Sequence, residues 1–435
     1  MIYLSLTGRE DWSTTLPDGK NAFFYPSVGI GWIFTELPGL KDNKILPYGK
    51  FRASYAIVAK DAIPYRTSTP FVQPLVADGW TTGVVFPYMG YNGYTLSDAL
   101  GNTELKPEKT KSWEIGIDLK FWKNRVGLSY TFFNNKGQDL LLDVPIAATT
   151  GYTTLYQNAG SMKTYGHEIT LDVVPIKSKD WDWDIIVNFA KINNEVLELA
   201  PGIENLFLGG FTEPQIRAVV GQPYRTIYGY DWKRDADGNV LIGDDGYPIQ
   251  GDAQVEMGNV DPDWTMGIGT NLRWKDLNLY LLFDIKVGGK MWDGTRGALD
   301  YFGTSEGSGD REELYVFEGI VESTGQVNAK PVLLNQAWRQ SGGSGFTGPS
   351  YDYIEKSNWV RLRTVTLSYT FTRLLKKTFI KGLELYFTGT NLWLSTPYKG
   401  IDPETNLLGA SNAQGMDYFN MPGTKSYTVG INLAL

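Results

Sequence analysis

Hydrophobic and polar residues alternate along most of this chain, in segments of about ten residues. In residues 113–121 every odd position is apolar, and every even position is polar or small. Successive side chains of a β-strand point to opposite faces, so this period of two predicts a strand with one apolar and one polar face. The same pattern recurs in residues 24–34, 51–59, 126–132, 167–173, 183–190, 264–274, 277–287, 365–371, 383–388 and 427–435. We expect about 13 or 14 strands, paired as antiparallel hairpins.

Short turns and long loops separate the predicted strands. Residues 123–125 and 275–276 are tight hairpin turns between neighbouring strands. Much longer connections cover residues 60–111, 200–215 and 288–351, and the last of these includes a candidate short helix in residues 303–320. This inequality is typical of transmembrane β-barrels, which have short turns at one end and long loops at the other.

Aromatic residues stand at the ends of several predicted strands. Trp264 and Trp274 bracket one strand, and Trp113 and Phe121 bracket another. Aromatic rings near both ends of a membrane strand form girdles at the two interfaces. A soluble antiparallel sheet with one buried face would give the same alternation. Its strands would be shorter, however, because soluble strands usually have about five or six residues. We therefore predict an all-β fold, a segment of an antiparallel transmembrane β-barrel.

The composition agrees with that fold and excludes several kinds of site. Aromatic residues make up 14% of the 435 residues, and there is a single His and no Cys. The lack of Cys excludes a disulfide framework, a zinc–thiolate site and an iron–sulfur cluster. A net charge of −8 argues against nucleic acid as a partner. No apolar run is long enough for a transmembrane helix, and residues 1–12 do not resemble a signal peptide. We expect the chain to begin within a strand.

No group of residues predicts an active site. His167 and Glu168 are neighbours, but the alternation places their side chains on opposite faces of a strand. Asp235 and Asp237 precede Gly238 in a pattern that favours an Asp-Gly turn. A bound cation near Asp235 and Asp237 is the less favoured interpretation, because the glycine comes too early for a calcium loop. We predict neither an enzyme nor a cofactor.

Two sets of residues are the candidates for function. The first lies on the polar side of the strands and is expected to face a hydrated lumen, although simple solvation explains any single member: Glu114, Asp118, Lys120, Glu168, Asp172, Asp184, Asn188, Asn271, Arg273, Asp284 and Glu384. The second set consists of loop aromatic residues, which can stack on sugar rings, contact peptides, hold the loops together or meet a partner protein: Tyr65, Trp80, Tyr88, Tyr91, Tyr94, Trp292, Tyr301 and Phe302.

Several stretches carry a family resemblance. The most specific are SNWVRLRTVTLSYTF at residues 357–371 and LELYFTGTNLWLSTPYKGIDPE at residues 383–404. Residues 150–175 combine a Gly-Tyr, an Asn-Ala-Gly and then a Gly-x-Glu strand, and residues 7–36 and 102–141 add further similarity. In these stretches the chain resembles the SusC/RagA-type TonB-dependent outer-membrane transporters of Bacteroidetes.

The resemblance implies a component of a nutrient importer in the bacterial outer membrane. Such importers take up glycans, oligosaccharides or peptides through a barrel of about 22 strands, and they have a plug domain, a SusD-type surface lipoprotein and energy supplied through TonB. No stretch of this chain corresponds to the plug or to the segment that contacts TonB. Residues 1–435 are therefore expected to be the C-terminal portion of the barrel.

Two features bear on how such a portion would assemble. Unpaired backbone groups cost several kcal/mol each in hydrocarbon, so the outer strands must pair with another chain or close a smaller barrel. The family usually ends in an aromatic residue, whereas this chain ends in Leu435. The alternative function is a soluble or surface carbohydrate-binding or adhesive β-protein without transport, and it requires the apolar faces to be buried against each other.

Overall fold

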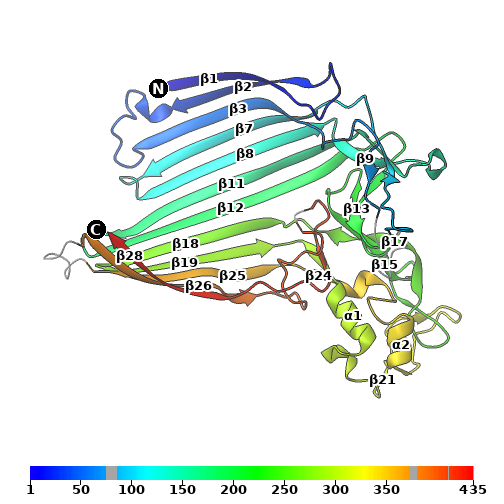
Figure 1. Ribbon diagram of the computed structural model, residues 1–435. Helices are drawn as coiled ribbons and strands as arrows, with labels where there is room; N and C mark the ends of the chain where they lie inside the picture. Colours follow the sequence, from blue (N-terminus) through cyan, green and yellow to red (C-terminus); the bar gives the residue numbers. More distant parts are fainter. Residues whose placement is uncertain (75–85, 372–379, 410, 435) are drawn as a thin grey trace.

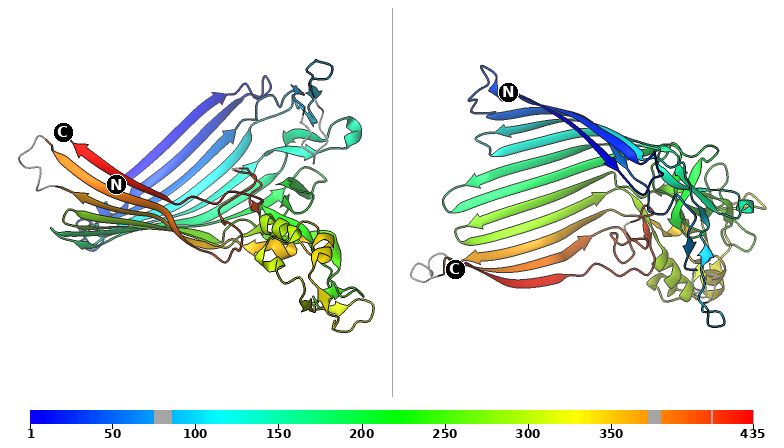
Figure 2. Two further views of the ribbon diagram at one scale, coloured as in Figure 1. Left: turned by 60° about the horizontal axis from the view of Figure 1, so that its bottom comes forward. Right: turned by 45° about the horizontal axis from the view of Figure 1, so that its top comes forward.

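A single large antiparallel sheet dominates the computed structural model, which describes residues 1–74, 86–371, 380–409 and 411–434. Within these residues the sheet has twelve strands, and strands that are adjacent in the sheet follow one another along the chain. Figure 1 shows them side by side, from β1 at one edge to β28 at the other, and Figure 2 shows that the sheet bends into an open trough. The strands are β1 (Ile2–Trp12), β2 (Ala22–Ile33), β3 (Tyr48–Lys60), β7 (Glu108–Phe121), β8 (Val126–Gln138), β11 (Ser161–Lys177), β12 (Trp181–Glu198), β18 (Trp264–Trp274), β19 (Leu277–Val287), β25 (Trp359–Thr370), β26 (Gly382–Ser395) and β28 (Ser426–Ala434).

The alternating segments of the sequence correspond to these strands. Each predicted segment lies largely within one strand of the sheet. The expected total of 13 or 14 long strands is slightly higher than the number observed in the large sheet, because the other strands in the described residues lie in the connections. Several strands run well beyond the alternating segment, and β12 has 18 residues.

The shortest turns and the longest connections lie at opposite ends of the sheet, and a connection of intermediate length, residues 34–47, lies at the end with the short turns. Residues 122–125 turn the chain through three consecutive residues with positive φ, Trp122, Lys123 and Asn124. Lys275, also with positive φ, begins the turn between β18 and β19. The long connections described at the other end span residues 139–160, 199–263, 288–358 and 396–425. The second is longer than the predicted 200–215, because it folds into a sheet of its own.

The long connections contain small sheets and two α-helices. The helices, α1 (Gly294–Phe302) and α2 (Gln336–Ser341), flank the segment 303–320 in which a helix was expected; that segment has only the short 3₁₀ helix Glu306–Ser308. Further 3₁₀ helices are Ala148–Thr150 and Ser350–Tyr353, and a 3₁₀ helix outside the long connections, Phe34–Glu36, follows β2. The strands of the connections are β4 (Phe71–Val72), β5 (Thr95–Leu96), β6 (Ala99–Leu100), β9 (Leu141–Pro145), β10 (Thr154–Asn158), β13 (Asn205–Gly210), β14 (Gln215–Val219), β15 (Thr226–Trp232), β16 (Leu241–Ile242), β17 (Gln250–Asn259), β20 (Lys290–Asp293), β21 (Leu314–Tyr315), β22 (Ile320–Val321), β23 (Val332–Leu333), β24 (Ile354–Lys356) and β27 (Met416–Asp417).

The buried hydrophobic residues gather in the connections rather than on the large sheet. The largest cluster, which we call the loop core, joins the connections 199–263, 288–358 and 396–425. Its members are Ile216, Ile227, Met257, Val260, Trp292, Tyr353, Ala413 and Met416. The loops at this end of the sheet are thus packed together, as Figure 1 shows beside β24 and α1. Among the described residues, neither α-helix is long and apolar enough to cross a membrane.

Candidate functional site on the polar face of the sheet

The strand register places the predicted polar residues on one face of the sheet. One row of paired positions crosses eight strands on this face: Lys50, Asp118, Ser129, Thr170, Asn188, Gly267, Asp284 and Arg361. The residues expected to face a lumen all belong to this polar face, which extends from β1 to β28.

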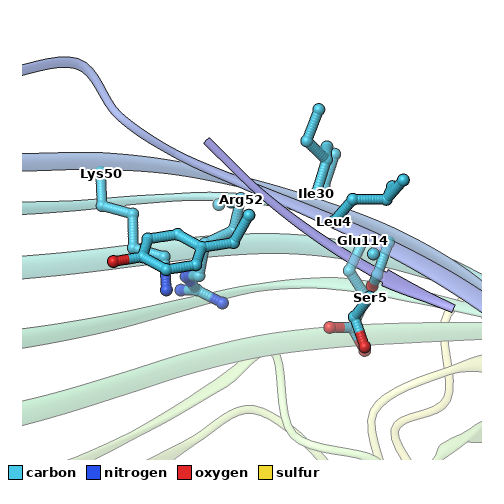
Figure 3. A pocket seen from close by; sticks show the side chains of 12 residues that line it. Leu4, Ser5, Ile30, Lys50, Arg52 and Glu114 are labelled. Carbon is cyan, nitrogen blue, oxygen red and sulfur yellow. The ribbon is translucent and has the colours of Figure 1, made fainter. Parts of the chain in front are cut away.

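Figure 3 shows the two faces at the β1 edge of the sheet. Lys50, Arg52 and Glu114 project from one side, whereas Leu4 and Ile30 project from the other. A cavity of about 490 Å³ lies here, lined partly by these polar side chains and by Gly29, Gly31 and Gly116. A second cavity of about 620 Å³ lies further across the polar face and includes Glu168, Asn188 and Asp284 among its lining residues.

An arginine that sequence reasoning missed connects three strands of the polar face. The Arg52 guanidinium donates to both carboxylate oxygens of Asp118, at 2.9 and 3.1 Å, and to Thr131 Oγ1 at 3.1 Å. It lies over Gly116, where an added Cβ would come within 2.9 Å of Arg52 Nη2. The glycine therefore leaves the space that the guanidinium occupies. An arginine at a polar position of a predicted strand was the only signal in the sequence.

A larger ion-pair network lies where the polar face meets the loops. Arg363 donates to Asp284 at 2.8 Å and to Glu404 at 2.8 Å, and Arg361 pairs with Asp402 at 2.7 Å. The Arg361 and Asp402 side chains are only 4% and 6% exposed. Because buried charges need partners, this network fastens the connection 396–425 onto the polar face. Of its members only Asp284 was predicted from the sequence.

The opposite face of the sheet is apolar and open. Ile115, Leu367 and Phe387 are 43%, 44% and 42% exposed although they lie in the interior of strands. Such a continuous exposed apolar surface indicates contact with another apolar phase. The soluble alternative required the apolar faces to be buried against each other, and in the described residues they are not.

Aromatic pairs mark both ends of the apolar face. Trp181 lies 5.8 Å from Trp274, between ring centroids, at the end with short turns. Phe189 lies 5.8 Å from Trp264 at the loop end. Trp113 and Phe132 form a similar pair, with centroids 5.3 Å apart. The predicted girdles are therefore present as rows of rings that bracket an apolar band.

The loop aromatic residues differ in their exposure. Tyr65, Tyr88, Tyr91, Tyr94 and Phe302 are between 65% and 78% exposed. Tyr301 is partly buried, with its ring 5.1 Å from that of Phe346, and Trp80 lies outside the described residues.

Trp292 fits one of the roles that the sequence left open for the loop aromatic residues, that of holding the loops together. Its side chain is only 4% exposed and stacks on Tyr418, so it belongs to the loop core and is not available to a ligand from solution. Sequence reasoning also missed a stacked group around Trp338, whose ring lies 4.5 Å from Tyr247 and 6.1 Å from Trp232. These rings are far apart along the chain, so no local sequence pattern predicts that they stack.

The remaining candidates have local structural roles. Asp235 Oδ1 accepts the backbone N–H of Asp237 at 3.0 Å and that of Asn239 at 2.8 Å, as in a tight turn. Hydrogen bonds, chiefly from the Asn239 side chain, lower the pKa of Asp235. His167 lies on the apolar face, where its Nδ1 is 2.9 Å from the Tyr130 hydroxyl.

Comparison with known proteins identifies the family of this chain. The model of a family described as TonB dependent receptor-like, beta-barrel, matches residues 2–392. The chain belongs to this family. It is therefore an outer-membrane β-barrel protein of the receptor class and not an enzyme, as the sequence predicted.

Relatives in this family are similar along nearly the whole chain. TonB-dependent receptor P3 of Formosa agariphila is 27% identical, and the match covers 99% of this chain and 43% of the relative. TonB-dependent receptor SusC of Bacteroides thetaiotaomicron is 25% identical, with 99% and 42% covered. The chain thus spans less than half the length of these curated relatives.

A solved structure of the RagAB peptide transporter shares the fold. The TM-score is 0.73 at 21% sequence identity, and the match covers 99% of this chain and 46% of the transporter chain. A second structure, of the RagAB peptide importer in its "open-open" state, has a TM-score of 0.72. Both SusC-like and RagA-like proteins are therefore neighbours of this chain, as the resemblance in its sequence indicated.

Proposed function

We propose that this chain forms part of the barrel wall of a TonB-dependent importer that takes up glycans or oligosaccharides, with peptides as the second substrate class. The observation that supports this most is that the two faces of the same sheet have opposite character. The apolar face carries an exposed band bracketed by aromatic rings, and the polar face carries charged networks and cavities. A wall between lipid and a hydrated lumen needs this combination.

The edges of the sheet constrain how the wall functions. Within the described residues β1 and β28 each pair with one neighbour only, β2 and β26. Their free backbone groups would cost several kcal/mol each in hydrocarbon. We propose that both edges pair with further strands in the functional importer, so that the polar face encloses a lumen.

The loops supply the second part of the proposal. The exposed tyrosines and Phe302 are on loops at the end of the sheet that also contains the packed loop core, where they can contact a partner or an oligomeric substrate. We propose that a SusD-like surface lipoprotein binds at this end of the barrel, and that TonB energises transport through the whole protein.

The test is uptake of labelled oligosaccharides and labelled peptides by three kinds of cell. One has the intact gene, one has a disrupted gene, and one has the intact gene but no TonB. We expect accumulation only in the first. Equal uptake in cells with the disrupted gene would contradict the proposal. Affinity purification in detergent tests the partner. A surface lipoprotein should co-purify with the importer, and its absence would contradict the proposed lipoprotein partner.

A further inference from the structure

A cavity of about 550 Å³ lies where the polar face of the sheet meets the loop core. Lys286 near the end of β19 and Trp359 at the start of β25 form its sheet side, and these two residues are direct neighbours across the strands. Lys290 and Ser357 line it next to them, and residues 403–406 belong to the segment on its loop side. We call it the donor cavity, because side chains that can donate hydrogen bonds line it.

Buried polar atoms in the donor cavity have no partner. The Ser357 side chain is 1% exposed and the Trp359 side chain 9% exposed, yet neither Ser357 Oγ nor Trp359 Nε1 makes a hydrogen bond within the described residues. Asn406 Oδ1 is also buried and has no hydrogen-bond partner within the described residues. Buried polar groups are nearly always hydrogen-bonded, so their gathering around one cavity indicates that something binds there.

The charges around the donor cavity leave a lysine without an anionic partner. Lys286 forms no ion pair among the described residues. The carboxylates that influence it electrostatically are Asp261 and Glu404. Asp261 is paired with Arg225, and Glu404 is paired with Arg361 and Arg363. Lys290 also has no ion pair among the described residues, but one of its three N–H groups is committed, because Nζ donates to the Met257 carbonyl at 2.6 Å.

We propose that the donor cavity binds a carboxylate group of the transported oligomer. Its free groups are an ammonium, a hydroxyl and an indole N–H, all of which donate, and an ionised carboxylate is a pure acceptor with room for several donors. Asn406 Oδ1 accepts a hydroxyl or amide N–H next to that carboxylate. This inference rests on the proposed function and names a chemical class of substrate: oligomers that carry carboxylates, either uronic acids in a glycan or acidic groups in a peptide.

The position of the donor cavity fits a subsite on a transport path. Trp359 and Glu404 line both this cavity and the cavity of about 620 Å³ on the polar face. The Arg361 and Arg363 guanidinium carbons lie 5.8 and 5.4 Å from the centroid of a Trp359 ring, which holds the indole in place. A ligand leaving the donor cavity therefore meets the polar face directly.

The experiment is isothermal titration of the intact importer in detergent with two matched pairs of probes. The first pair is tetragalacturonate and its neutral methyl ester, and the second is tetra-alanine with a free C-terminus and its C-terminal amide. We expect the charged member of at least one pair to bind about tenfold more tightly than the neutral member, since a hydrogen bond to a charged group is lost with the charge. The pair that shows the preference identifies the source of the carboxylate.

Two variants and a control locate the effect. Lys286→Met should remove most of the preference, and Trp359→Phe, which keeps an aromatic ring but removes the N–H, should reduce it less. Lys50→Met is the control, because Lys50 is also on the polar face but lines the distant cavity at the β1 edge. The absence of a preference in both pairs would overturn the inference, as would an equal loss in Lys50→Met. If either result is found while TonB-dependent uptake of neutral oligomers continues, the proposed function is still supported and only the carboxylate site is wrong.

Discussion

At the scale of single residues, burial decides which ion pairs of the polar face matter. Arg361 and Asp402 are almost fully buried, and Asp402 also accepts the backbone N–H of Glu404 at 3.0 Å. Arg273 and Asp182 form a looser pair, with a shortest distance of 3.3 Å and exposed fractions of 39% and 21%. Removal of one partner from a buried pair leaves an uncompensated charge, whereas a solvated pair contributes little.

Arg361→Met should therefore release the connection 396–425 from the sheet. We expect a loss of about 3–5 kcal/mol in local stability, because Asp402 is left buried without its guanidinium. Arg273→Met is the matched control and should cost less than about 1 kcal/mol. Hydrogen–deuterium exchange of residues 402–425 measures both. Equal protection in the two variants would show that the buried pair does not hold this connection.

Glu213 gives a pH dependence at the same scale. Its Oε1 accepts the backbone N–H of Tyr230 at 2.8 Å and that of Ser350 at 3.1 Å, and burial raises its pKa. The folded loops thus hold this proton more tightly than the unfolded chain does, so their stability falls as pH rises between the ordinary pKa of 4.5 and the raised value.

Glu213→Gln should remove that pH dependence, because its amide oxygen can accept the same hydrogen bonds without titrating. Exchange protection of residues 215–232, corrected for the intrinsic effect of pH, should decline across this interval in the natural protein and stay level in the variant. A decline of the same size in both would assign the dependence to another group.

At this scale the sequence predicts the direction of strand side chains but not their partners. The alternation correctly separates Glu168 from His167, because the direction of a strand side chain depends only on its position along the strand. The partners of Arg52 depend on which strands lie side by side in the sheet. The partners of Arg361 and the burial of Trp292 depend on loops that meet across long stretches of chain. No local pattern contains that information.

At the scale of elements, the strands divide into a membrane part and a loop part. A tilted membrane strand needs about 9–11 residues, yet β11 and β12 have 17 and 18. In β12 the rings of Trp181 and Phe189 bracket the apolar stretch, and the residues after Phe189 lead toward the loops. The sequence predicted the alternating part of β12 well, but not its extension, because polar residues such as Asn193 and Asn194 break the apolar pattern while the backbone continues to pair.

Two neighbouring isoleucines in β12 test this division. Ile185 lies on the apolar face, midway between the aromatic pairs, and Ile186 lies on the polar face. Ile185→Arg should cost about 2–4 kcal/mol in folding into a bilayer, as expected near the middle of the membrane. Ile186→Arg should cost much less because its side chain faces the hydrated side. Urea titration of folding into lipid vesicles measures both, and equal costs would mean that the two faces do not differ in their surroundings.

At the scale of the whole molecule, the sheet reverses the usual arrangement of a soluble protein. Its apolar face is exposed, and the described hydrophobic clusters lie in the loops. This arrangement is stable only if lipid covers the apolar face and further strands cover the edges. The sequence predicted the lipid-facing sheet from a repeated local pattern. It could not predict the loop core, because three separate connections assemble it.

The most direct test of the account is a cysteine scan along β11 in the intact outer-membrane protein. This chain has no Cys of its own, so each substitution from residue 164 to residue 172 introduces the only thiol of these 435 residues. Labelling of the unsubstituted protein is subtracted as background. With a charged, water-soluble thiol reagent in outer-membrane vesicles, we predict strong labelling at the even positions of the polar face and weak labelling at the odd positions. Uniform labelling, or stronger labelling at the odd positions, would contradict a sheet with one face in lipid and the other along a hydrated lumen.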